Sequence, residues 1–355
     1  MSDFEITVDG QTVTASEGET VLTAATRAGV HIPTLCHDPR LDPAAACRTC
    51  LVEVSGSGRL QPACAWRAQA DMTVVTDNAR IKRHRAVLLS MYLADHELDE
   101  DGLPVERPGG NQLREMVVQE GHAFNLEPVH APRGDREDRN PYVQFNPDAC
   151  ILCARCTRYC DEVEAVSAIS LAGRGSATTI STVAELSLLD TSCELCGGCI
   201  DVCPTGAMFE GKAPVHAPED VEKVRSTCNF CGVGCQLDLN VLDGAVVKVT
   251  APPPGTTVND GNLCVKGRFA YDFIHHDERL TTPLIRRDDG ELHPCSWEEA
   301  IAATAKGLLG VKARHGADSL GFVSSARCTV EENYLMQKLA RAAFGTNNCH
   351  QCAAT

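Results

Sequence analysis

The stretch Cys150-Ile-Leu-Cys-Ala-Arg-Cys-Thr-Arg-Tyr-Cys160 is repeated, with the same cysteine spacing, as Cys193-Glu-Leu-Cys-Gly-Gly-Cys-Ile-Asp-Val-Cys203. At the spacing C-x2-C-x2-C-x3-C, three thiolates wrap one face of a cubane iron–sulfur cluster, and the fourth reaches a second cluster. A zinc site takes paired C-x2-C elements and leaves the third and fourth cysteines unused. The repeat therefore predicts iron–sulfur clusters in preference to zinc or disulfide bonds.

The repeat belongs to a larger pattern, because sixteen of the 20 cysteines in this 355-residue chain form four consecutive sets of four. The sets are Cys36, Cys47, Cys50 and Cys64; Cys150, Cys153, Cys156 and Cys160; Cys193, Cys196, Cys199 and Cys203; and Cys228, Cys231, Cys235 and Cys264. The two sets in the repeat are expected to cross. One 4Fe–4S cluster would take Cys150, Cys153, Cys156 and Cys203, and the other would take Cys193, Cys196, Cys199 and Cys160. The chain is predicted to carry electrons.

Charge and hydropathy exclude two classes of partner. The formal net charge is −16, whereas binding to a nucleic-acid backbone requires clustered Lys and Arg. The first residues, Met1–Val8, lack the basic and apolar regions of a signal peptide. No apolar run approaches the roughly 18 residues that a membrane span requires. We expect a cytoplasmic protein without direct membrane insertion, in which thiols stay reduced and available to metal.

Residues 1–79 are expected to form a small β-rich domain. Phe4–Val8 and Thr12–Ala15 alternate on either side of Asp9-Gly10, a strong turn signal. The spacing C-x10-C-x2-C-x13-C over this domain resembles the β-grasp 2Fe–2S ferredoxin domain at the start of complex I large subunits, iron hydrogenases and NAD-linked formate dehydrogenases. The resemblance implies a 2Fe–2S cluster held by Cys36, Cys47, Cys50 and Cys64.

Residues 80–140 are expected to form a helical linker domain. The apolar spacing from Asn78 to His96 predicts a helix. Three basic side chains on this helix are expected on a solvated face, with a face toward a partner as the alternative. These are Lys82, Arg83 and Arg85.

In the proteins that the chain resembles, residues in this region bind a further 4Fe–4S cluster through one histidine and three cysteines. His96 stands where that histidine would be, yet no cysteine occurs between Cys64 and Cys150. We therefore predict that this site is degenerate and its cluster absent. His96 is expected to be an ordinary surface or capping histidine.

Residues 141–212 are expected to form a bacterial-type ferredoxin domain with two 4Fe–4S clusters, since Cys203-Pro204 completes the C-x2-C-x2-C-x3-C-P pattern. The insertion between the two cysteine runs includes an expected hairpin around Gly173–Gly175.

Residues 221–277 carry the last set of four cysteines. Cys228, Cys231 and Cys235 follow C-x2-C-x3-C, and Cys264 lies beyond a strand-like stretch. The pattern resembles the N-terminal 4Fe–4S domain of molybdopterin oxidoreductases. The resemblance implies that Lys266 lies between the cluster and the pterin; the alternative is a surface lysine. His275 and His276 are not expected to bind metal, because neither has a second ligand at a useful spacing.

Residues 278–355 are expected to be the start of a doubly wound α/β domain, which makes the whole chain α+β and multi-domain. A helix from Trp297, a strand over Leu320–Ser325 and a helix from Thr329 to Phe344 support this prediction. The segment Arg268–Arg286 resembles the alpha chain of NAD-linked cytoplasmic formate dehydrogenases. The remaining cysteines are expected to be buried or free thiols: Cys295, Cys328, Cys349 and Cys352.

Laid on that family, Cys352-Ala353 matches a cysteine–alanine pair, and Thr355 falls one residue before the cysteine or selenocysteine that binds molybdenum or tungsten. This alignment places no catalytic residue within the chain. It leaves three explanations open: an in-frame UGA codon, a boundary set by cloning, or a split gene.

The family resemblance implies that formate is oxidised to carbon dioxide at a molybdenum or tungsten bis-molybdopterin guanine dinucleotide. Electrons would then pass through one 2Fe–2S and three 4Fe–4S clusters to NAD. The implied partners are a flavin- and NAD-binding iron–sulfur subunit, a small 2Fe–2S subunit, and a C-terminal molybdopterin domain in the same or another chain. Two alternatives remain open: a standalone electron-relay subunit, and a complex I-like large subunit or another molybdopterin oxidoreductase. An iron hydrogenase is disfavoured, because a pterin-type domain follows where a hydrogenase cluster domain would begin.

Overall fold

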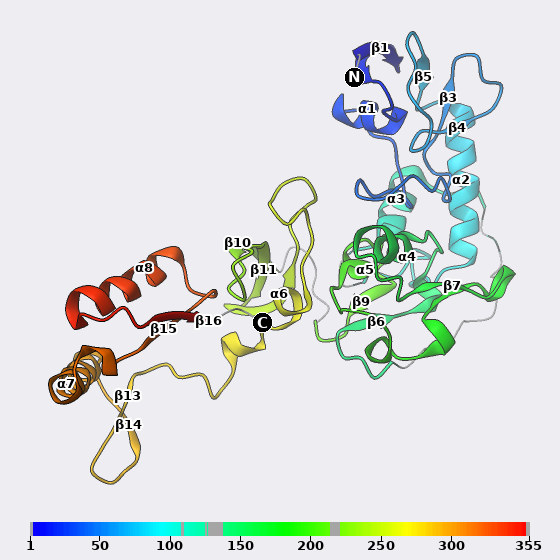
Figure 1. Cartoon of the computed structure of the whole chain (residues 1–355). Coiled ribbons are helices and arrows are strands. Elements are labelled where there is room, and N and C mark those ends of the chain that lie inside the picture. Colours follow the sequence, from blue (N-terminus) through cyan, green and yellow to red (C-terminus); the bar gives the residue numbers. More distant parts are fainter. Residues whose placement is uncertain (1–2, 108–109, 125, 127–137, 214–220, 353–355) are drawn as a thin grey trace. The chain divides into compact units, whose positions relative to one another are not determined.

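The computed structural model describes residues 3–107, 110–124, 126, 138–213 and 221–352. The chain divides into two compact units, Met1–Asp220 and Val221–Thr355, which are described one at a time (Figure 1). Ala353 and Thr355, on which the expected alignment at the end of the chain depends, lie outside the described residues.

The first unit begins with a five-stranded sheet in the order β2-β1-β5-β3-β4. Its strands are β1 (Asp3–Val8), β2 (Gln11–Ser16), β3 (Leu51–Val54), β4 (Gln61–Pro62) and β5 (Thr73–Val75). Asp9 and Gly10 both have positive φ, 49° and 83°, as a tight two-residue hairpin turn requires. Helix α1 (Val21–Arg27) packs its buried face into the same core, which also contains Cys50 and Cys64. The two predicted N-terminal strands are confirmed.

Helices α2 (Ala79–Ala94) and α3 (Gln112–Glu120) follow the sheet. The predicted helix is confirmed, and Lys82 and Arg83 are exposed as expected. The expectation of a solvated face is wrong for Arg85, which is 3% exposed. Its guanidinium donates to the carbonyl oxygens of Thr49 (3.2 Å) and Thr76 (3.0 Å) and lies 3.4 Å from the Glu120 carboxylate. Arg85 therefore anchors α2 to the loop that carries Cys47 and Cys50.

The two cysteine runs each lead into a short helix. The first leads into α4 (Arg155–Arg158), which continues as the π-helical turn η2 (Tyr159–Val163), and the second leads into α5 (Gly198–Asp201). Strand β6 (Val143–Phe145) pairs antiparallel with β9 (Met208–Glu210) and joins the two ends of this region. The expected hairpin is confirmed as β7 (Ser170–Ala172) paired with β8 (Thr179–Ser181).

The second unit opens with a three-stranded antiparallel sheet of β10 (Glu222–Thr227), β11 (Gln236–Leu242) and β12 (Ala245–Thr250). Helix α6 (Val265–Phe269) follows Cys264, which is its N-cap residue. Leu237, Val249, Leu263 and Tyr271 form a small buried core between the sheet and the segment around this helix.

The rest of the second unit contains the hairpin of β13 (Leu284–Arg286) and β14 (Leu292–Pro294), followed by α7 (Trp297–His315). Strand β15 (Phe322–Ser325) pairs in parallel with β16 (Cys349–Cys352), and α8 (Val330–Lys338) with its π-helical extension η9 (Leu339–Phe344) connects them. A parallel strand pair joined by a helix is the repeating unit of a doubly wound domain.

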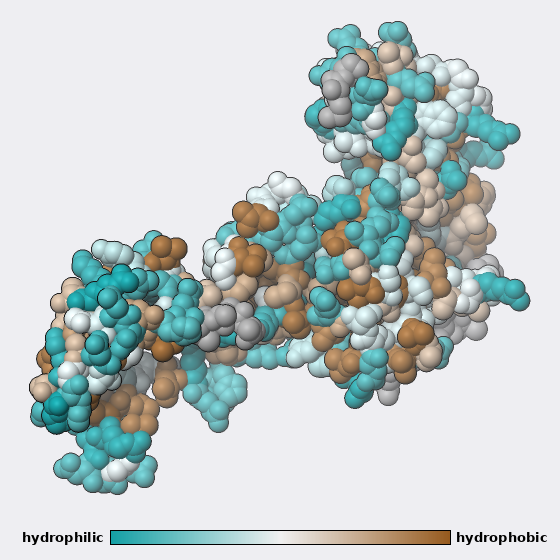
Figure 2. Space-filling view, viewed as in Figure 1, coloured by the Kyte–Doolittle hydropathy of each residue, from teal (hydrophilic) through white to brown (hydrophobic). Residues whose placement is uncertain are grey.

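Apolar side chains also reach the surface of this region. Trp297 on α7 and Val330 on α8 are 71% and 81% exposed, and Figure 2 shows brown apolar areas among hydrophilic ones over the part that carries these helices. Among the described residues, no helix has the length and apolar character needed to cross a bilayer.

Candidate iron–sulfur cluster sites

The two cysteine runs of the repeat adopt the same unusual backbone turn. Leu152 and Ala154 have φ of 55° and 57°, and the equivalent Leu195 and Gly197 have 54° and 74°. Three of these four residues are not glycine, so the left-handed conformation is unfavourable by itself. The turn directs amide N–H groups to sulfur: Leu152 N to Cys150 Sγ and Leu195 N to Cys193 Sγ, both at 3.4 Å. Such N–H groups stabilise anionic sulfur, as cluster ligands require.

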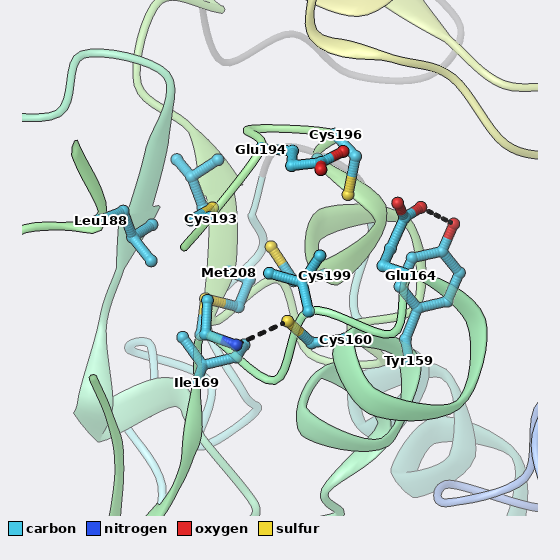
Figure 3. A pocket seen from close by; sticks show the side chains of 14 residues that line it. Tyr159, Cys160, Glu164, Ile169, Leu188, Cys193, Glu194, Cys196, Cys199 and Met208 are labelled. Carbon is cyan, nitrogen blue, oxygen red and sulfur yellow. Dashed lines mark hydrogen bonds between the residues drawn. The ribbon is translucent and has the colours of Figure 1, made fainter. Parts of the chain in front are cut away.

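Four cysteine sulfurs from both runs face one cavity (Figure 3). The cavity has a volume of about 40 Å³, and its cysteines are Cys160, Cys193, Cys196 and Cys199. Amide N–H groups of Ala168 and Gly198 donate to Cys160 Sγ (3.2 Å) and Cys196 Sγ (3.4 Å). Apolar side chains complete the wall, among them Ile169, Leu188 and Met208 (Figure 3). The set mixes the fourth cysteine of the first run with three of the second.

The other four cysteines of the repeat also lie together. Burial raises the pKa of the Cys156 thiol well above its usual value, and the nearby Cys153, Cys203 and Cys150 raise it further. Burial likewise raises the pKa of Cys153 to about 11. Four adjacent buried thiolates repel one another unless cations neutralise them, and the iron of a cluster supplies that charge. The donor set therefore fits an iron–sulfur cluster.

The sulfurs in the N-terminal domain gather two by two. Cys36, Cys47, Cys50 and Cys64 are each at most 3% exposed. A hydrogen bond between the two side chains lowers the pKa of Cys47 to about 5 and raises that of Cys36, and Cys64 and Cys50 form a second pair of this kind. The Cys47 amide also lies 3.4 Å from Cys36 Sγ. Two pairs of thiols match a binuclear cluster with four cysteine ligands.

Within the described residues, no three His, Cys, Asp or Glu side chains gather as they would around a single metal ion.

The expected exposure of His96 is wrong, since this residue is 9% exposed. Its Nδ1 lies 2.9 Å from the carbonyl oxygen of Glu97. Burial lowers the pKa of His96 below its usual value. The absence of a cluster at this position stays a prediction.

This burial predicts an acid-sensitive step in stability. Because folding lowers the pKa of His96, the unfolded chain binds more protons than the folded chain once the pH falls below about 6.5, the pKa in the unfolded state. The contribution of His96 to the free energy of unfolding is therefore intact above that pH and is lost as the pH falls toward the pKa in the folded state. Burial also lowers the pKa of His37 and His84, which share the effect. We expect His96→Phe to reduce the drop in thermal midpoint between about pH 7.5 and 5.5.

The control for this measurement is His31→Gln, since His31 is exposed in the same unit. An equal drop in wild type and His96→Phe would contradict the assignment.

The fourth site lies in the second unit. Its four cysteines and Lys266 line a cavity of about 300 Å³. The cysteines are Cys228, Cys231, Cys235 and Cys264. Gly234 has a φ of 72°, and the Cys228 amide donates to the Cys235 carbonyl at 2.8 Å, closing the ligand loop. Burial raises the pKa of Cys228. Lys266 lies on α6 at the edge of the cavity, two residues after Cys264.

Two residues that the sequence did not single out bind the N-terminal cysteine loop. Arg155 and Arg158 donate hydrogen bonds to backbone carbonyls around Cys36. The helical spacing of residues 155, 158, 159 and 162 was the available signal, because these positions share one face of a helix.

Four family models match consecutive parts of the chain. They are the 2Fe–2S iron–sulfur cluster binding domain (residues 2–79), the ferredoxin-like domain of NADH-quinone oxidoreductase subunit 3 (140–209), the molybdopterin oxidoreductase Fe4S4 domain (221–276) and the molybdopterin oxidoreductase domain (279–355). From residue 221 on, the chain is similar to molybdopterin oxidoreductases. The predicted fold class is confirmed by these matches and by the mixed α and β structure of both units.

Relatives of the chain are named for different activities. An NADH-quinone oxidoreductase subunit of Rhizobium meliloti is 39% identical over 97% of this chain, and the NADPH-Fe(3+) oxidoreductase alpha subunit of Geobacter sulfurreducens is 34% identical over 97%. A Staphylococcus haemolyticus protein, whose name proposes it as a formate dehydrogenase, is 29% identical over 98%. The chain spans about two fifths of the length of these curated relatives, 39–40%.

One solved structure also resembles the chain. It is a chain of an NAD+-reducing [NiFe]-hydrogenase in the H2-reduced state, with 30% identity and a TM-score of 0.53. The match covers 61% of this chain and 91% of that chain. Relatives of the chain are therefore subunits of multi-subunit redox complexes.

Proposed function

We propose that this chain is the iron–sulfur part of a formate dehydrogenase alpha subunit, in which formate oxidation to carbon dioxide is coupled to NAD reduction through a flavin-carrying partner. The observation that carries the electron-transfer role is the gathering of cysteine sulfurs in sets of four, with amide N–H groups directed at them. The segment Arg268–Arg286, which resembles that of NAD-linked formate dehydrogenases, favours formate.

The proposal assigns sixteen cysteines to four clusters. Cys36, Cys47, Cys50 and Cys64 would hold a 2Fe–2S cluster, and the three other sets would each hold a 4Fe–4S cluster. These three sets are Cys150, Cys153, Cys156 and Cys203; Cys193, Cys196, Cys199 and Cys160; and Cys228, Cys231, Cys235 and Cys264. The shared cavity of Cys160 with Cys193, and the electrostatic coupling of Cys203 to Cys156, support the crossed assignment.

When bound, these clusters supply carriers that accept and release single electrons. The chain's own residues set the surroundings of the carriers. Leu188 and Met208 supply apolar walls of the cavity at Cys160, while the amides of Leu152 and Leu195 donate to ligand sulfurs. Apolar surroundings disfavour the negative charge that reduction adds to a cluster and therefore lower its reduction potential. Hydrogen bonds from N–H groups to the sulfurs favour that charge and raise the potential.

Lys266 is proposed to lie between the fourth cluster and a molybdenum or tungsten pterin. Its place in the cavity wall beside Cys264 supports this role, because a cation there would attract the negative charges of both groups. The pterin would be bound by a C-terminal molybdopterin domain in the same or another chain. A flavin- and NAD-binding iron–sulfur subunit and a small 2Fe–2S subunit would complete the complex.

A second candidate function is that of an NADH-quinone oxidoreductase-like large subunit. It is favoured by the 39% identity to the Rhizobium meliloti oxidoreductase subunit, which is higher than the 29% to the Staphylococcus haemolyticus protein. Both functions use the same clusters, so the cysteines do not separate them. The two functions are distinguished by the metal at the pterin and by the substrate that supplies the electrons.

The test uses the complex purified without oxygen from its native host by a tag on this chain. We expect molybdenum or tungsten to co-purify with iron and sulfide, and formate to reduce NAD. NADH-dependent quinone reduction by a complex without molybdenum or tungsten would favour the second candidate. Iron and sulfide alone, with neither activity, would contradict both enzyme proposals and indicate an electron relay.

A further inference from the structure

The helix that follows the first three cysteines of the repeat binds the ligand loop of the N-terminal domain. Arg158 on α4 donates from Nη2 to the carbonyl oxygen of Cys36 and from Nη1 to that of Asp42, both at 2.6 Å. Arg155 donates to the carbonyl oxygen of His37 and, at 3.0 Å, to the side chain of Gln112. Two guanidinium groups thus bind the loop that begins at Cys36, which lies more than a hundred residues away in the sequence.

Two further contacts come from the next helical turn, η2. The Glu162 carboxylate accepts a hydrogen bond from the Asp42 amide at 2.7 Å, and the guanidinium of Arg40 lies 5.1 Å from the centre of the Tyr159 ring. Arg155, Arg158, Tyr159 and Glu162 are spaced i, i+3, i+4 and i+7 and therefore share one helix face. Cys156 and Cys160, one residue further along, occupy the adjacent face toward the two 4Fe–4S sites.

The loop that begins at Cys36 is also in apolar contact with the predicted 4Fe–4S site that contains Cys153. Cys36 and Cys47 belong to the same buried cluster of side chains as Cys153 and Leu89. The helix therefore fixes both the position of the N-terminal ligand loop and its separation from the repeat. A rigid separation favours electron transfer, because misplaced groups slow a reaction that depends on geometry.

The positive charge of Arg155 and Arg158 is only partly balanced, because the Glu162 carboxylate binds the same loop and the charge of Arg155 also acts on Asp38. Arg40 forms a paired interaction with Asp38 at 3.0 and 3.1 Å. By contrast, among the described residues neither Arg155 nor Arg158 has a carboxylate within salt-bridge distance, and the buried Nε of each has no hydrogen-bond partner. Two positive charges beside a ligand loop favour addition of an electron, because the net charge around a cluster helps to set its potential.

We propose that Arg155 and Arg158 are positioning residues that hold the Cys36 loop against the ferredoxin-like helix and raise the reduction potential of the 2Fe–2S cluster. This inference rests on the proposed ligand set Cys36, Cys47, Cys50 and Cys64. It goes beyond that set, because it assigns the potential of one centre to two side chains that belong to the neighbouring domain.

The test is a potentiometric titration of the 2Fe–2S EPR signal in the full chain, reconstituted with iron and sulfide without oxygen. We expect Arg158→Gln to change the ratio of reduced to oxidised centre at a fixed potential roughly tenfold toward oxidised, which for one electron equals about 59 mV. Arg155→Gln should shift it in the same direction. Arg158→Lys keeps the charge and should stay within about threefold of wild type.

The matched control is Arg174→Gln, since Arg174 is an exposed basic residue of the same unit in the turn between β7 and β8. Potentials of Arg158→Gln and Arg155→Gln equal to that of the control would overturn the inference, as would equal shifts in Arg158→Lys and Arg158→Gln. If Arg158→Gln assembles no 2Fe–2S centre, Arg155→Gln decides; loss of the centre in both also overturns a potential-setting role. Wild-type protein without a 2Fe–2S signal would instead contradict the proposed ligand set.

Discussion

Replacing Cys156 with serine is expected to remove about four iron atoms per chain, the content of one 4Fe–4S cluster. Cys156 lies among Cys150, Cys153 and Cys203 in the most deeply buried thiol environment of the repeat. Serine is a poor ligand for the softer iron–sulfur core, and the three remaining thiols lose the cations that allow them to lie so close together. Iron and sulfide analysis with EPR of the reduced protein measures the loss.

The control is Cys328→Ser, because Cys328 is exposed and belongs to none of the four sets. It should leave iron content unchanged. The crossed assignment makes a sharper demand: Cys203→Ser should remove the same EPR signal as Cys156→Ser, and Cys160→Ser the same signal as Cys193→Ser. If Cys160→Ser instead removed the signal that Cys156→Ser removes, each cysteine run would hold its own cluster and the crossing would be wrong.

Local chemistry made the ligand loops predictable. The cysteines of one run are close in the sequence, and the loops that they form are closed by local hydrogen bonds, such as that from Leu152 N to Cys150 Sγ. The first hairpin was predictable for the same reason, since Asp9-Gly10 provides its positive φ angles without help from the rest of the fold. The helix from Thr329 also begins as predicted, with a reciprocal capping box to Glu332.

Long-range contacts were not predictable in this way. Arg85 and His96 are polar residues that a helical pattern places outside, yet both are buried. Arg85 can be buried because its guanidinium donates to the carbonyl oxygens of Thr49 and Thr76. Arg155 and Arg158 resemble ordinary basic residues between cysteines until the Cys36 loop is folded against them. The partners of Arg85, Arg155 and Arg158 come from distant segments, so only the assembled unit identifies their roles.

Substituting Gly198 with alanine is expected to destabilise the first unit by about 3 kcal/mol, the upper part of the usual range for overpacking. A Cβ at Gly198 would lie 1.9 Å from Cε1 and 2.4 Å from Cζ of Tyr159. The Tyr159 ring is 1% exposed, and its hydroxyl donates to Glu164 at 3.2 Å, so it has little room to move away. For a unit of this size, the change corresponds to a fall in thermal midpoint of about 6–12 °C.

The clash also bears on the clusters, because Gly198 precedes Cys199 and Tyr159 precedes Cys160, and both cysteines line one cavity. Moving the helix instead of the ring would displace Cys199, so we expect Gly198→Ala to lose iron on heating before wild type does. Gly58→Ala is the control, since a Cβ there meets nothing within 4 Å; it should stay within about 0.5 kcal/mol of wild type.

A double-mutant cycle separates the steric cause from a general effect of alanine. Tyr159→Leu removes the ring atoms that the new Cβ would meet, so the double variant Gly198→Ala/Tyr159→Leu should be less destabilised than the sum of the two single variants. Additive losses of stability would show that the Tyr159 ring is not the cause of the destabilisation by Gly198→Ala. A favourable coupling would instead show that glycine is needed here because Tyr159 fills the space where the two cysteine runs meet.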